Sequence, residues 1–117
     1  MRRRPVSPFH VERVEPPDGT RGVLRGDPVL VRLSAPLDVG RLHEATLEIR
    51  EVGGAVPSRV ETLDGGRVLV WWPGRLLRPG HEHRLVARGL RDHQGREAPP
   101  LSSRFTPGAL DGEELRS

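Results

Sequence analysis

Short apolar runs separated by turn-forming residues dominate this sequence and restrict what it can fold into. The chain has 14 Gly and 12 Pro among 117 residues, and they stand between the apolar segments. Within the segments apolar and polar side chains alternate, which is typical of strands with one buried face. The expected strands cover residues 9–14, 29–33, 46–52, 56–63, 67–72, 82–90 and 102–106. About seven strands at this spacing predict an all-β, two-sheet sandwich.

The turns between these strands have recognisable chemistry. Pro16-Pro17-Asp18-Gly19 predicts a reversal because Pro restricts φ and Asp-Gly favours a turn. Asp64-Gly65-Gly66 predicts a tight hairpin. Asp38 is a candidate N-cap for one helical turn within residues 37–44. Pro57, which has no N–H to give to a sheet, indicates an edge position.

Length and composition limit the organisation of the chain. We expect one domain over residues 9–107, a basic tail at 1–8 and a polar tail at 108–117. There is no Cys, which excludes disulfides and thiolate metal sites. No stretch approaches the roughly 18 apolar residues of a membrane span. The Arg-rich start is followed by no apolar segment, so we expect no export signal in the sequence as it stands.

Segment 67–72 contains apolar residues on both of its faces. We expect Trp72 in the core. The other buried residues are the apolar residues on one face of each predicted strand. Together, the expected buried residues are Val31, Leu33, Leu47, Ile49, Val68, Val70, Trp72, Leu85 and Phe105. Trp71 then faces outward. With few apolar residues available for a second core, the sequence predicts an exposed partner-binding patch. Its members are Trp71, Leu69, Val86, Arg84 and Arg88. The alternative is that a loop or the N-terminal strand covers Trp71.

Six short motifs follow one another along most of the chain. They are Val14-Glu15-Pro16-Pro17-Asp18-Gly19, Val29–Leu33 with Ser34, Pro36, Leu37 and Asp38, Trp72-Pro73, Leu77-x-Pro79-Gly80, Gly89-Leu90-x-Asp92-x-x-Gly95, and Phe105-Thr106. In order and spacing they resemble the bacterial immunoglobulin-like (Ig-like) domains of surface-layer and other cell-surface proteins. The resemblance implies an Ig-like sandwich over roughly residues 9–107. The sequence departs from that family at His83, where Tyr is usual, and at Arg96, where Asn is usual.

Several residue patterns raise the question of chemistry, and each has a simpler explanation. His81-x-His83 is the best metal candidate, but it needs a third ligand from His10, His43, His93 or a distant carboxylate. We therefore expect a core role for His83 and no tight metal site. Asp92 suits a calcium ligand or, more simply, an Asx turn.

Catalysis and nucleic-acid binding receive little support. The Ser residues lie in no nucleophile-elbow motif, and we expect no enzyme and no small-molecule substrate. All 19 basic residues are Arg, but 16 acidic residues leave a net charge of only +3. Together with the scarcity of aromatic residues, this argues against nucleic-acid binding by Arg2–Arg4 or by Arg84 and Arg88.

These observations favour a non-catalytic Ig-like module with no cofactor and with a protein partner or self-assembly as its function. It would act as a spacer, adhesion or assembly unit of a bacterial surface or secreted structure, and the resemblance implies an extracytoplasmic location. The alternative is a self-standing accessory or decoration subunit of a particle assembled inside the cell, which the missing export signal favours.

Overall fold

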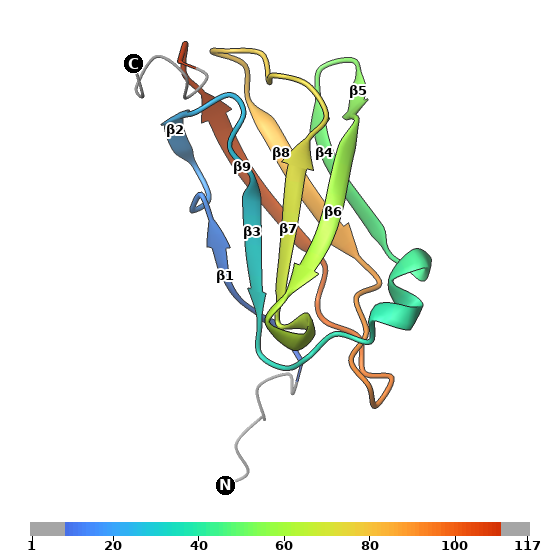
Figure 1. The fold of residues 1–117 in the computed structure, drawn as a ribbon. Helices are drawn as coiled ribbons and strands as arrows, with labels where there is room; N and C mark the ends of the chain where they lie inside the picture. The colour runs from blue at the N-terminus through green and yellow to red at the C-terminus, as the bar shows by residue number, and fades with distance from the viewer. Residues whose placement is uncertain (1–8, 111–117) are drawn as a thin grey trace, which may run out of the picture.

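An antiparallel sheet and a mixed sheet pack face to face in the computed structural model, which describes residues 9–110 (Figure 1). One sheet has four strands in the order β1-β3-β7-β6, and the other has five in the order β2-β9-β8-β4-β5. The bounds are β1 Val11–Glu15, β2 Thr20–Val23, β3 Val29–Leu33, β4 Thr46–Glu51, β5 Gly54–Val56, β6 Ser58–Leu63, β7 Val68–Pro73, β8 His83–Arg88 and β9 Leu101–Pro107. The Ig-like β-sandwich expected from the sequence is confirmed, with nine strands.

The two additional strands come from short segments. Residues 20–23 form β2, which pairs in parallel with β9 through Thr20–Phe105 and Arg21–Thr106. The expected strand 56–63 is divided at Pro57 into β5 and β6, which belong to different sheets. Each of them is the edge strand of its sheet, as expected for a segment that contains Pro.

The turns form where the sequence places them. Asp18 Oδ1 accepts a hydrogen bond from the Arg104 N–H at 2.7 Å, which attaches the first turn to β9. Asp64–Gly66 forms a short 3₁₀ turn between β6 and β7. A second 3₁₀ helix, Val39–Glu44, has Asp38 as its N-cap, and the Asp38 carboxylate accepts from the Gly40 N–H at 3.2 Å. The tail expected at 1–8 and residues 111–117 of the tail expected at 108–117 lie outside the described residues.

The core lies between the sheets, and most of the expected set is buried. Five of the nine expected residues belong to the core cluster, namely Val31, Leu33, Ile49, Leu85 and Phe105. Val68 and Val70 are also buried, but on the outer face of the four-stranded sheet. Leu47 is half-buried against the core. Trp72, by contrast, is half-exposed, and the fully buried tryptophan is its neighbour Trp71.

The expected assignment of the two faces of β7 is therefore wrong. Trp71 pairs with Val29 and Leu69 with Val31, so these four side chains share the inner face. Val68, Val70 and Trp72 point to the outer face of the four-stranded sheet. Because β7 is apolar at every position from Val68 to Trp72, its own alternation does not distinguish the faces. The neighbouring strand β3 does, because Arg32 pairs with Val68 and needs solvent.

No helix among residues 9–110 has the length and apolar character needed to cross a bilayer.

Candidate functional site

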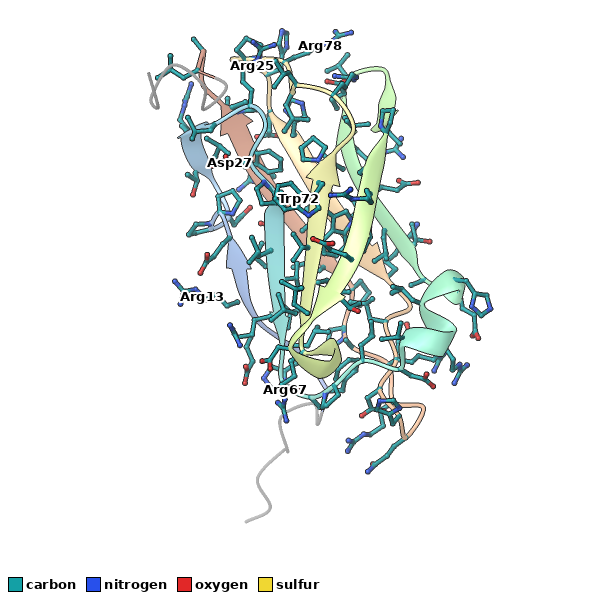
Figure 2. The ribbon with its side chains drawn as sticks, viewed as in Figure 1. Arg13, Arg25, Asp27, Arg67, Trp72 and Arg78 are labelled. Carbon is teal, nitrogen blue, oxygen red and sulfur yellow. The ribbon has the colours of Figure 1, made fainter. Side chains whose placement is uncertain are left out.

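The outer face of the four-stranded sheet carries a partly exposed tryptophan, several arginines and a hollow. Strand pairing arranges its side chains in rows across β1, β3, β7 and β6. One row is Arg13, Arg32, Val68 and Leu63; the next is Glu15, Leu30, Val70 and Glu61; the third is Trp72 and Arg59. We call these ten residues the Trp72 face. Figure 2 shows Trp72 near the C-terminal end of β7 and Arg13 at the β1 edge of this face.

Trp72 is held in a defined position on this face. Its indole Nε1 donates a hydrogen bond to Glu61 Oε1 at 2.7 Å. The Arg59 guanidinium carbon lies 5.9 Å from the centre of the indole ring, within the range of a cation–π contact. A partly exposed Trp next to Arg is a composition typical of protein-binding surfaces.

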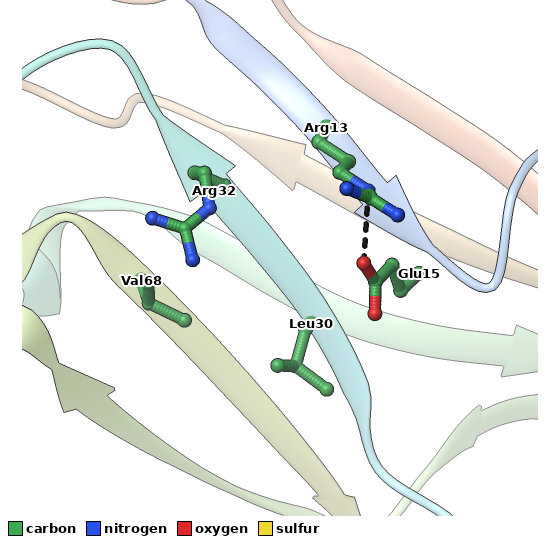
Figure 3. A pocket seen from close by; sticks show the side chains of 5 residues that line it. All are labelled: Arg13, Glu15, Leu30, Arg32 and Val68. Carbon is green, nitrogen blue, oxygen red and sulfur yellow. Dashed lines mark ion pairs between the residues drawn. The ribbon is translucent and has the colours of Figure 1, made fainter.

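A hollow opens on the same face between β1, β3 and β7. Its lining residues are Arg13, Glu15, Leu30, Arg32 and Val68 (Figure 3). Arg13 and Glu15 form an ion pair, Nε to Oε1, at 2.8 Å on one side of the hollow. Arg32 lies on the other side, above Val68. The hollow therefore has an apolar base and a charged rim, with two guanidinium groups and one carboxylate.

The predicted patch of five residues is not assembled. Trp71 and Leu69 are 0% exposed in the core, where they pack against the facing sheet. Arg84 and Arg88 are exposed and Val86 is half-buried, but all three lie on β8 in the five-stranded sheet. The prediction of an exposed Trp71 is thus wrong, for the reason given for β7. The rule behind it, that one of the two adjacent tryptophans faces outward, applies to Trp72 instead.

His83 occupies the core position expected for it. Its ring is fully buried and stacks on Phe105 with a centroid distance of 5.6 Å. Its Nδ1 is 2.8 Å from the His81 carbonyl oxygen, so an Nδ1–H donates there. Its Nε2 lies 3.3 Å from Glu51 Oε2.

Glu51 connects His83 to the loop between β7 and β8. The Glu51 carboxylate accepts a hydrogen bond from Arg75 and lies 3.8 Å from the Arg78 guanidinium. Burial acts to raise the pKa of Glu51, but the Arg75 hydrogen bond and the charges of Arg75, Arg78 and His83 outweigh it and hold that pKa below its usual value. Sequence reasoning missed this cluster because Glu51 and His83 are far apart in the chain.

The expected Asx turn forms at Asp92. Its Oδ1 accepts from the Gln94 and Arg96 N–H groups at 3.0 and 2.9 Å. The Arg96 guanidinium lies 2.7 Å from Oδ2. Burial acts to raise the pKa of Asp92, but these hydrogen bonds and the Arg96 charge lower it overall. Arg96 thus occupies the position in which a cation would have to approach the turn.

Metal donors do not gather in the described part of the chain. Within residues 9–110 no three His, Cys, Asp or Glu side chains are placed so that they share an ion. His81 is exposed and precedes β8, so it does not share a strand face with His83.

The architecture is that of bacterial Ig-like β-sandwich domains, and comparisons with solved structures agree. L,D-transpeptidase 3 from Mycobacterium tuberculosis is 27% identical, with a TM-score of 0.58 over 85% of this chain and 37% of its own. The surface layer protein SbsC, domains 1–6, is 20% identical, with a TM-score of 0.62 over 86% of this chain and 14% of its own. This chain therefore spans well under half the length of these two proteins.

A second group of similar structures is of this chain's own size. CopC from Methylosinus trichosporium OB3b is 15% identical, with a TM-score of 0.69 over 86% of this chain and 93% of its own. PcoC, a copper resistance protein from Escherichia coli, is 14% identical, with the same TM-score over 84% and 98%. No family model and no curated protein matches the sequence. The structural comparisons therefore support the bacterial surface-type Ig-like fold and do not single out one family.

Proposed function

We propose that this chain is a non-catalytic Ig-like module that serves as a structural and binding unit in a bacterial surface or secreted assembly. The observation that carries the proposal is the match of the sandwich to domain-sized parts of longer chains. It corresponds to 14% of a surface layer protein and 37% of a transpeptidase. A fold used in this way supplies spacing and contact surfaces, and function depends on the site it presents.

The distribution of polar groups supports a binding role over catalysis. The Asp92 carboxylate is engaged by its own turn, and Glu51 by Arg75 and His83. These arrangements stabilise the fold. The Trp72 face, in contrast, presents Trp72, Arg32 and Arg13 outward. We therefore assign partner binding to this face.

Cellular fractionation tests the proposal. The chain is tagged and produced in its native cells, which are separated into cytoplasm, envelope and medium after chemical cross-linking. We expect the chain in the envelope or the medium, cross-linked to a larger protein. Trp72→Ser on the proposed face should reduce the cross-link, whereas the matched change Val86→Ser on the opposite sheet should not. A monomeric, uncross-linked chain confined to the cytoplasm would contradict the proposal.

The whole-chain matches favour a second candidate, a self-standing accessory subunit of a particle assembled inside the cell. The fold covers 93% and 98% of the solved CopC and PcoC chains, which supports its use as an independent small protein. Co-sedimentation of the tagged chain with cytoplasmic particles would select this function.

A further inference from the structure

Two arginines stand directly opposite each other on the Trp72 face. Arg13 of β1 and Arg32 of β3 are partners in the antiparallel pairing, and both point outward. Side chains in such positions have their Cβ atoms about 4.5–5.5 Å apart, and like charges there oppose the pairing. Anionic groups close to the two guanidinium groups reduce this repulsion.

The compensation within the chain is unequal. Arg13 has a close partner in Glu15 at 2.8 Å. The nearest carboxylate to Arg32 belongs to Asp64, with N and O atoms 3.9 Å apart and side chains that are 54% and 63% exposed. An exposed pair at that distance contributes little. Arg32 therefore retains the capacity to bind a further carboxylate, and its planar guanidinium suits two parallel hydrogen bonds.

A second hollow borders the hollow beside Arg32. The second hollow shares Glu15 and Leu30 with the first and reaches the loop before β3. Its other lining residues are Pro16, Gly22, Val23, Leu24, Asp27 and Pro28. We call the two hollows together the β1–β3 groove. It has Arg13 and Arg32 at one end, apolar side chains along its length, and Asp27 at the other end.

We propose that the β1–β3 groove binds an extended segment of a partner protein in which an acidic side chain is followed by aliphatic residues. The acidic side chain lies between Arg32 and Arg13, and the aliphatic residues lie on Leu30 and towards Leu24. Asp27 repels a second carboxylate at the far end, which favours uncharged side chains there. This inference rests on the proposed function, because it specifies the partner of the same face.

The lining of the groove favours a protein segment over a polyanion. A nucleic acid or another polyphosphate places a negative charge at regular intervals, and both Glu15 and Asp27 would oppose it. The apolar residues between them bind aliphatic side chains, which such polymers lack. One carboxylate next to aliphatic groups matches the observed order of charges.

Peptide selection followed by nuclear magnetic resonance tests the proposal. The full chain is used to select binders from a random-peptide display library, and a selected peptide is titrated into the ¹⁵N-labelled chain. We expect an acidic residue next to aliphatic ones, and shifts at Arg13, Leu30 and Arg32. Arg32→Gln should weaken binding about ten-fold or more, since a hydrogen bond between charged groups is lost. Arg88→Gln is the matched control, because Arg88 is an exposed arginine on β8 of the opposite sheet and its loss should change binding little.

Three other results would overturn the proposal. One is selection of peptides without an acidic residue, or with equal affinity for the wild type and for Arg32→Gln. Another is that inorganic phosphate or a single-stranded DNA oligomer causes the same shifts as the peptide. The third is a dimer in sedimentation that dissociates on Arg32→Glu, which would make a second copy the occupant of the groove. Thermal unfolding of each variant shows that it is folded.

A negative result for peptide binding in the β1–β3 groove can be distinguished from a negative result for the proposed function. A chain found in the envelope whose groove binds no acidic peptide would retain the module role and lose this inference. A chain that binds the peptide through Arg32 but sediments with cytoplasmic particles would retain the inference and change the assembly to which it applies.

Discussion

Replacing each of the two adjacent tryptophans with Ala tests the face assignment of β7. Trp71 is 0% exposed and belongs to the core cluster, whereas Trp72 is half-exposed on the outer face. Truncation of a buried Trp costs about 3–5 kcal/mol through lost burial and the resulting cavity. For domains of about 60–100 residues each kcal/mol lowers the melting temperature by about 4–8 °C. We expect Trp71→Ala to remove a large part of a total stability of about 5–15 kcal/mol.

Trp72→Ala removes smaller contributions. It loses one hydrogen bond to Glu61 and one contact with Arg59, each worth about 0.5–1.5 kcal/mol at an exposed site. Part of the ring is already in water, so little burial is lost. We expect a destabilisation of about 1–3 kcal/mol in total, below that of Trp71→Ala.

Urea denaturation followed by circular dichroism measures both values without relying on tryptophan fluorescence. Trp71→Phe is a useful third variant. The indole Nε1 of Trp71 has no acceptor among residues 9–110, so replacing it with carbon removes an unsatisfied donor as well as some volume. It should cost clearly less than Trp71→Ala. A larger loss for Trp72→Ala than for Trp71→Ala would refute the assignment of Trp71 to the inner face.

Two further predictions concern the carboxylates and the turn before β7. Glu51 and Asp92 have lowered pKa values in the folded chain, so their contribution to the free energy of unfolding is present above the unfolded pKa values of 4.5 and 3.8 and is lost as the pH falls through the folded pKa values. The free energy of unfolding, measured by urea denaturation, should therefore drop between about pH 5 and pH 2. The drop should be smaller in Glu51→Gln and Asp92→Asn, and an unchanged pH dependence in both variants would contradict this. Gly66→Ala should destabilise more than Gly65→Ala in thermal melts, because both have positive φ but only at Gly66 would a Cβ lie 3.0 Å from the Leu37 carbonyl oxygen; equal losses would show that this close approach costs nothing.

The elements whose signals are local could be predicted from the sequence. Alternation within 29–33 and 82–90, Asp-Gly chemistry at two turns, and the Asp38 cap each depend on neighbours in the chain, and all of them are present in the structure. The role of Asp92 in its own turn is local in the same sense. These features need no knowledge of which strands pair.

The sequence predicted the type of candidate site but not the residues that form it. An outward-facing Trp near Arg on a sheet face was expected, but its members were not. Arg13 and Arg32 become neighbours through the pairing of β1 with β3, and Trp72 meets Arg59 through the pairing of β7 with β6. Residues far apart in the chain carry no sequence signal that relates them, so the groove between β1 and β3 could not be anticipated.

The sequence alone determined that this chain is a β-sandwich with given turns, because strand alternation and turn chemistry are properties of a few consecutive residues. Only the tertiary structure decided which face of β7 is buried. That strand is apolar on both sides, so the choice depends on its neighbours: Val29 and Val31 of β3 require the core, and Arg32 requires solvent. The pairing of β7 with β3 therefore places Trp71 inside and Trp72 outside. The pairing of β4 with β8 places Glu51 beside His83.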